Sequence, residues 1–129
     1  MQRRFVWLAL AALGLGLACL EYSGPGHRFV RGHLGDVAAT MLVYAAFGFT
    51  GWSQPGRVAA ALSVAVAVEL GQIVWSPLGR SGAGALVIGS VFDPWDLAAY
   101  AAGVAVGIIW ETGLPGPRSR AGRAVSHGG

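Results

Sequence analysis

Long apolar runs, separated by short segments rich in glycine, proline and charge, dominate the pattern of this 129-residue chain. Four runs stand out, over residues 5–20, 36–52, 57–75 and 94–110. A helix of about 18 residues rises about 27 Å, which is close to the thickness of the hydrocarbon core of a bilayer. The pattern therefore predicts an all-α, polytopic integral membrane protein with about four transmembrane helices.

The first apolar run follows Arg3 and Arg4, an order that is also typical of a signal peptide. Ala18 precedes Cys19, as at a lipoprotein cleavage site, but Gly16 stands where such a site has a branched apolar residue. We therefore interpret this run as an uncleaved first span, with cleavage as the alternative.

The segments between the runs predict how the helices are connected. Residues 21–35 contain Gly, Pro, His and Arg and are expected to form a loop at the membrane surface. Asp36 is suited to cap the second helix, because its carboxylate can accept the free N–H groups of a first turn. The sequence SQPG at residues 53–56 predicts a tight turn, so the second and third helices should be antiparallel neighbours.

The last helix is predicted to begin where Asp93 is the cap, Pro94 the first helical residue and Asp96 part of the first turn. The Gly-rich residues 78–92 before it include an apolar piece too short to cross a bilayer, so we expect a surface strap or a re-entrant segment. Residues 1–112 then form one membrane domain. Residues 113–129, rich in Pro, Gly and Arg, are expected to be a disordered cytoplasmic tail.

Composition supports a membrane protein, because 54% of the residues are hydrophobic and only 12% are charged, about half the usual share. The basic charge comes from nine arginines and no lysine, which are scattered over loops and termini. Without a basic stripe or interleaved aromatic residues, this pattern argues against nucleic-acid binding. The single cysteine excludes an internal disulfide framework and a Cys-rich zinc site.

The arginines also predict the orientation. With the N-terminus inside, six arginines lie on the inner side, and Arg28, Arg31 and Arg80 lie outside. Because positive charge is enriched in cytoplasmic segments, both termini are expected to be cytoplasmic. Four tryptophans fall near predicted span ends, as interfacial aromatics do.

Glu69 is the residue that most needs an explanation, because an ionised carboxylate inside a membrane helix costs at least about 2.5 kcal/mol unless it is paired, protonated or hydrated. Gln72 lies three residues later, on the same helix face. The predicted topology places most other internal polar residues on the same outer side. The candidate binding residues are Arg31, His33, Asp36, Glu69, Gln72, Arg80, Asp93, Asp96 and Tyr100.

Simpler interpretations exist for several of these residues. Asp36 and Asp93 can be helix caps only, and Glu69 can be a structural partner of Arg31 or Arg80. No His pair has the spacing of metal ligands on a helix, so neither a metal nor another cofactor is predicted, and no Ser or Cys has the setting of a nucleophile.

Small and polar residues at four-residue spacing predict helix contacts. Asp36, Thr40 and Tyr44 give the second span a polar edge. Two small-residue stripes predict close packing of the third span on the fourth. These stripes are Ala59, Ser63, Ala67 and Gly71, and Ala99, Gly103 and Gly107.

Three short motifs carry a family resemblance: residues 31–36 (RGHLGD), Glu69 with Gln72, and residues 92–96 (FDPWD) followed by Tyr100 and Gly103. With these motifs the chain resembles a family of small bacterial membrane proteins, domain-of-unknown-function family 2809, related to the VanZ-like proteins. VanZ-like proteins carry a similar Glu-x-x-Gln on a membrane helix, and one is associated with teicoplanin resistance. The resemblance implies a role in the cell envelope, at the bacterial cytoplasmic membrane, and no enzymatic activity is established for the family.

Three functions fit the sequence. The first is a non-enzymatic membrane protein whose outer polar site binds a lipid headgroup or an envelope-active amphiphile. The second is an enzyme acting on a lipid-linked substrate, with Glu69 as acid or base and arginines holding phosphate. The third is a small accessory subunit of a transporter.

Overall fold

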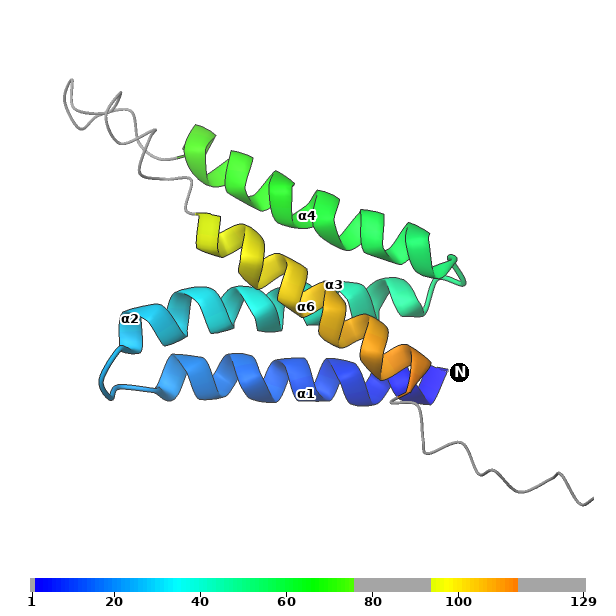
Figure 1. The fold of residues 1–129 in the computed structure, drawn as a ribbon, viewed down its shortest axis with the longest axis horizontal. Helices are drawn as coiled ribbons and strands as arrows, with labels where there is room; N and C mark the ends of the chain where they lie inside the picture. Colours follow the sequence, from blue (N-terminus) through cyan, green and yellow to red (C-terminus); the bar gives the residue numbers. More distant parts are fainter. Residues whose placement is uncertain (1, 76–93, 114–129) are drawn as a thin grey trace, which may run out of the picture.

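The part of the chain that the structure describes is an all-α bundle of four long helices that alternate in direction (Figure 1). The computed structural model describes residues 2–75 and 94–113, with the backbone alone for residues 72–75. The helices are α1 (Gln2–Glu21), α2 (His27–Phe29), the π-helix η1 (Val30–Leu34), α3 (Gly35–Gly48), α4 (Gln54–Trp75) and α6 (Pro94–Thr112).

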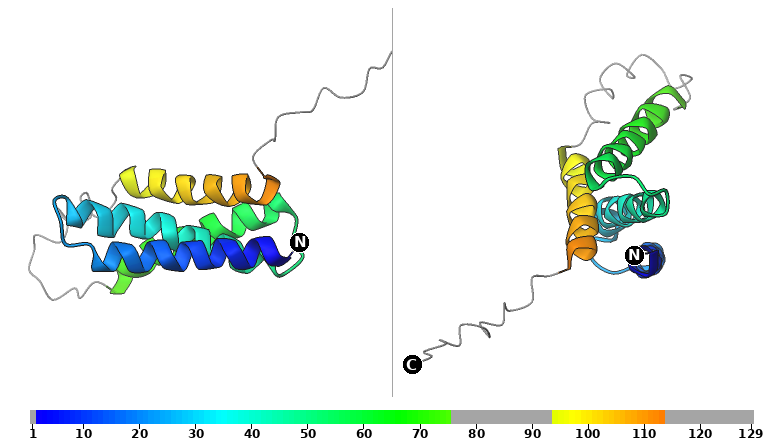
Figure 2. Two further views of the ribbon diagram at one scale, coloured as in Figure 1. Left: turned by 90° about the horizontal axis from the view of Figure 1, so that it is seen from below. Right: turned by 90° about the vertical axis from the view of Figure 1, so that its right-hand side faces the viewer.

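Helix α3 lies at the centre of the bundle and packs against α1, α4 and α6 (Figures 1 and 2). The start of α1 lies beside the end of α6, where the Trp110 indole N–H donates to the Arg4 carbonyl at 3.0 Å. The starts of η1 and α6 lie together at the opposite end. Polar residues at the helix ends therefore gather at two separate places.

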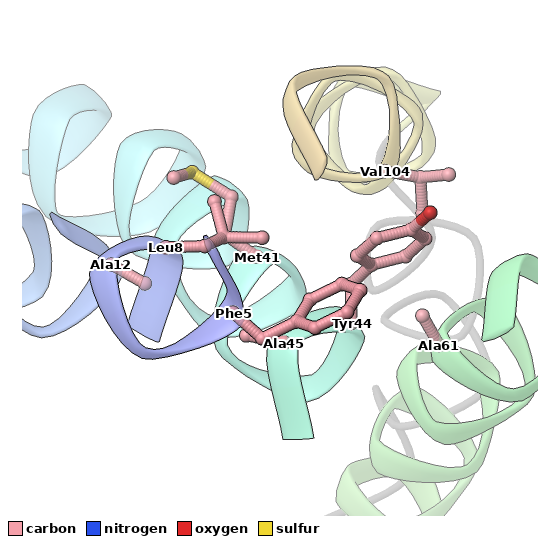
Figure 3. Close-up of a cluster of buried hydrophobic side chains, with 8 residues drawn as sticks. All are labelled: Phe5, Leu8, Ala12, Met41, Tyr44, Ala45, Ala61 and Val104. Atoms are coloured by element: carbon pink, nitrogen blue, oxygen red, sulfur yellow. The ribbon is translucent and has the colours of Figure 1, made fainter. Parts of the chain in front are cut away.

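The core between these two ends is built mainly on α1 and α3 (Figure 3). Its largest fully buried side chains are Tyr44 and Leu8. In Figure 3 Tyr44 extends from α3 toward Val104 of α6. The buried cluster consists of Phe5, Leu8, Ala12, Met41, Tyr44, Ala45, Ala61 and Val104.

Large apolar side chains also cover the outside of the bundle. On α1 the exposed residues Leu10, Leu13 and Leu17 lie away from the buried Leu8 and Ala12. Within residues 2–75 and 94–113, α1 is the one helix long and apolar enough to cross a membrane, and near an N-terminus a signal sequence can meet the same criteria. One of the four predicted spans thus meets the length and hydropathy criteria, and the multi-pass arrangement stays a prediction.

The predicted loop over residues 21–35 is wrong in its second half. Only Tyr22–Gly26 connects the helices, with Gly26 at a φ of 70°, and the chain is helical from His27 to Gly48. Gly32 and Gly35 lie within this helical run; each costs only about 1 kcal/mol relative to alanine, which tertiary packing can offset. Asp36 is consequently not a helix cap, because Leu34 precedes α3 and Asp36 lies in its first turn.

The turn between the second and third long helices lies nearer the N-terminus than the predicted residues 53–56. Helix α3 ends at Gly48, and α4 already begins at Gln54. Pro55 fits the first turn of α4, because a backbone N–H at that position would have no acceptor within the helix. The expected adjacency of the second and third long helices is confirmed, since α3 packs against α4.

The predicted contact between the two small-residue stripes is also wrong. Gly103 and Gly107 of α6 are buried against α3: a Cβ on Gly103 would lie 2.8 Å from the Thr40 Cβ and from the Val37 carbonyl oxygen. The stripe on α4 is exposed, and α4 instead buries Arg57, Ala61 and Ala65. Small-residue stripes favour close packing but do not select the partner.

Helix α6 begins at Pro94 with Asp96 in its first turn, as predicted. The predicted strap over residues 78–92, the cap residue Asp93, and the tail beyond Gly113 lie outside the described residues.

Candidate functional site

Five polar residues meet where η1, α3, α4 and α6 approach one another. We call them the His33 cluster: His33, Asp36, Glu69, Asp96 and Tyr100. His33 Nδ1 lies 3.1 Å from Asp96 Oδ1, and the two side chains are 20% and 24% exposed. The cluster is therefore partly open, although each residue comes from a helix packed in the bundle.

The π-helix supplies His33. His33 and Asp36 are three residues apart and share a helix face, while Asp96 is brought opposite them by the first turn of α6. The Phe29 ring contacts the imidazole edge-on, with centroids 4.5 Å apart. A π-turn inside a helix is a frequent feature of functional sites.

Glu69 is held by a tyrosine. The Tyr100 hydroxyl donates a hydrogen bond to Glu69 Oε1, and Tyr100 is buried. The suggested pairing of Glu69 with Arg31 is not what the described residues show, because Arg31 donates instead to the Leu20 carbonyl oxygen at 2.5 Å. The other suggested partner, Arg80, lies outside the described residues.

The His33 cluster holds three carboxylates and one imidazole. The Asp96 and Glu69 carboxylates repel the negative charge of Asp36, and the His33 imidazole offsets part of this repulsion. One ligand atom each from His33, Asp36 and Asp96 lie within 4.8 Å of one another, a donor set that suits a divalent cation. Residues 33 and 96 are too far apart in the sequence for their spacing to indicate this set.

The structure thus brings together five of the nine predicted binding residues. Arg31 lies on η1 but is bonded to the end of α1, and Gln72 lies on α4 in the part described by backbone alone. Arg80 and Asp93 lie outside the described residues.

A second polar cluster lies at the opposite end of the bundle. We call it the Glu111 cluster: Arg4, Tyr44, Arg57 and Glu111. Glu111 accepts from the Tyr44 hydroxyl at 2.5 Å and forms an ion pair with Arg57. Arg4 Nη1 donates to the Glu111 carbonyl oxygen at 2.7 Å, so the cluster ties α1, α3, α4 and α6 together.

In the predicted topology, the start of the third span and the end of the fourth both lie on the inner side, but the sequence analysis did not pair Arg57 with Glu111. The sequence contains an indication of this pair, because Arg57 begins the third apolar run and Glu111 directly follows the last one. Helices of similar length that run in opposite directions bring such residues to the same level. Tyr44, at the end of the predicted polar edge of α3, completes the cluster.

Comparison with known proteins gives one match. A family model described as "Protein of unknown function (DUF2809)" matches residues 26–104. No curated protein and no solved structure matches the chain. All five residues of the His33 cluster lie within the matched range, whereas Arg4 and Glu111 lie outside it. Since the match covers more than half of the sequence, the chain belongs to the DUF2809 family.

Proposed function

We propose that this protein is an integral membrane protein whose His33 cluster binds the cationic amine of a polar lipid headgroup or of another envelope amphiphile. The observation that carries the proposal is that the Asp36 and Asp96 carboxylates gather at the His33 imidazole, with the Glu69 carboxylate near enough to repel the charge of Asp36. Such a site is complementary to a positive group.

The outer surface supports a membrane location. Large exposed apolar side chains occur on α1, α4 and α6, and their contact with water would be unfavourable over so large an area. Three tryptophans, Trp52, Trp95 and Trp110, are exposed near helix ends, as expected for side chains at a membrane interface. The other exposed apolar residues include Val6, Leu10, Leu13, Leu17, Phe49, Leu62, Val66, Val68, Leu70, Leu97, Val106 and Ile109.

Electrostatics supports a cationic ligand. Carboxylates crowded together in a medium of low dielectric need compensation by protons or by positive charge. A primary ammonium group can donate charge-assisted hydrogen bonds to several carboxylate oxygens at once. The sequence suggested that outer arginines hold a phosphate, but Arg31 is turned to the Leu20 carbonyl, and the described cluster is acidic.

The proposal can be tested with the full chain purified in a non-ionic detergent. We expect phosphatidylethanolamine to bind and to raise the unfolding temperature more than phosphatidylcholine does, because the methylated ammonium of phosphatidylcholine has no N–H to donate to the carboxylates. Asp96→Asn should weaken this binding about tenfold, the effect of losing one charged hydrogen bond. Glu21→Gln is the matched control, because Glu21 is an exposed carboxylate at the same end of the bundle.

Two outcomes would contradict an amine ligand. Equal binding of both lipids, unaffected by Asp96→Asn, would remove the assigned site. Stabilisation by a divalent cation, abolished by a chelator and unaffected by phosphatidylethanolamine, would assign the same cluster to a metal instead.

The His33–Asp96 contact favours one alternative, an enzyme acting on a lipid-linked envelope substrate. A carboxylate that orients an imidazole is a common arrangement for a general base. Under this alternative, incubation with bacterial envelope lipids yields a new product with the wild type and none with His33→Gln. Binding without turnover supports the first proposal.

A further inference from the structure

A cavity of about 520 Å³ opens at the end of the bundle opposite the His33 cluster. It lies between the start of α1, the connection from α3 to α4, the start of α4 and the end of α6. The residues that line it include Arg4, Phe5, Phe49, Trp52, Gln54 and Arg57. This volume is within the range of small-molecule sites.

The polar side of the cavity carries an excess of positive charge. Arg4 and Arg57 supply two guanidinium groups, while Glu111 is the one carboxylate in the lining. Glu111 is already engaged, through its ion pair with Arg57 and its hydrogen bond from Tyr44. The start of α4 at Gln54 also faces this space and adds the positive end of a helix dipole.

Arg57 gives a second, independent indication of a ligand. It is only 7% exposed, and its buried Nε has no hydrogen-bond acceptor among the described residues. Its terminal nitrogens bond to Glu111 and to the Trp52 carbonyl oxygen. A buried donor without an acceptor is costly, so an acceptor oxygen supplied by a ligand would be stabilising.

We propose that this cavity binds a phosphate-type anion, with Arg4, Arg57 and the start of α4 as its donors. Guanidinium groups match the geometry of phosphate oxygens, and helix N-termini favour anions. The aromatic rings of Phe5, Phe49 and Trp52 beside these donors suit the glycerol and first acyl carbons of a phospholipid. This site is separate from the His33 cluster and carries the opposite charge.

The test uses the full chain in a zwitterionic detergent and measures binding and thermal unfolding. The probes are phosphatidylglycerol, phosphatidylcholine and inorganic phosphate. We expect phosphatidylglycerol to bind and stabilise, and Arg4→Gln to weaken its binding about tenfold. Arg3→Gln is the control, because Arg3 is the neighbouring exposed arginine and does not line the cavity.

Each outcome is informative. Stabilisation by phosphatidylglycerol alone identifies a lipid phosphate, and stabilisation by inorganic phosphate as well identifies free phosphate as sufficient. The proposal would be overturned if neither phosphatidylglycerol nor inorganic phosphate bound, if phosphatidylcholine bound as well as phosphatidylglycerol, or if the Arg4→Gln and Arg3→Gln variants bound identically. Because Asp96→Asn lies at the other end, it should leave phosphatidylglycerol binding unchanged even if the amine site is wrongly assigned.

Discussion

Two tyrosines join helices that are distant in the sequence. Tyr100 of α6 donates to Glu69 of α4, and Tyr44 of α3 donates to Glu111 of α6. Both tyrosines are buried, and a hydrogen bond to a charged group contributes about 1.5 to 3 kcal/mol. At the residue scale, these phenol–carboxylate contacts hold the two polar clusters in place.

Glu69 should therefore be coupled to Tyr100 and not to Arg31. We expect Glu69→Gln and Tyr100→Phe to show a coupling free energy of about 0.5 to 3 kcal/mol in a double-mutant cycle. The cycle of Glu69→Gln with Arg31→Gln should be additive within about 0.5 kcal/mol, because Arg31 bonds to the Leu20 carbonyl. Unfolding in detergent measures both, and coupling to Arg31 alone would contradict the observed contact.

The sequence indicated that Glu69 needs a partner but not which residue provides it. A carboxylate is expected to pair with a positive charge, so the sequence pointed to Arg31 or Arg80. That expectation does not single out a neutral hydroxyl group. Tyr100 becomes the partner because it lies four residues after Asp96, on the same side of α6. That contact depends on how α4 crosses α6, which residue types alone do not determine.

At the element scale, α3 and α6 approach each other closely at two glycines. Thr40 and Tyr44, from the predicted polar edge of α3, lie against Gly103 and Gly107. The sequence predicted both the edge and the stripe correctly, but it matched the stripe with α4. Two residues of this polar edge pack against the glycines of α6.

Gly103→Ala should destabilise the protein by about 1 to 3 kcal/mol, because the added methyl group would overlap the Thr40 Cβ and the Val37 carbonyl oxygen. Gly71→Ala is the matched control, since a Cβ there has no described neighbour within 4 Å and alanine is the better helix former. Thermal unfolding in detergent compares the two. Equal stability of the variants would contradict the close packing of α3 on α6.

Helix α1 should remain part of the mature protein. Phe5, Leu8 and Ala12 belong to the core, so removing α1 would expose Met41 and Tyr44 of α3. We expect the intact mass of protein extracted from membranes to include residues 2–21. A mass that corresponds to cleavage before Cys19 would instead support the lipoprotein interpretation.

Apolar runs located the long helices well, since α1, α4 and α6 begin and end within a few residues of the predicted bounds. The same rules failed at residues 27–35, where glycine and histidine indicated a loop. These residues are helical because they continue α3 and pack beside α1 and α6. Local propensity is weak enough for such packing to override it.

On the scale of the whole molecule, two polar clusters of different charge lie at opposite ends of an apolar bundle (Figure 1). The His33 cluster is acidic, and the cavity beside the Glu111 cluster is basic. The alternating directions of the four helices place the start of α1 and the end of α6 on the side of the Glu111 cluster. If the bundle spans a membrane, the two clusters face opposite leaflets.

A fusion after Gly129 tests most directly whether the protein is inserted in the membrane with both termini in the cytoplasm. A fluorescent protein that folds only in the cytoplasm should glow there, and the fluorescence should stay in the membrane fraction after an alkaline wash, because six of the nine arginines favour cytoplasmic termini. Fluorescence released into the soluble fraction would contradict insertion. A dark fusion, with an active periplasmic reporter at the same position, would contradict the orientation and place the acidic cluster inside.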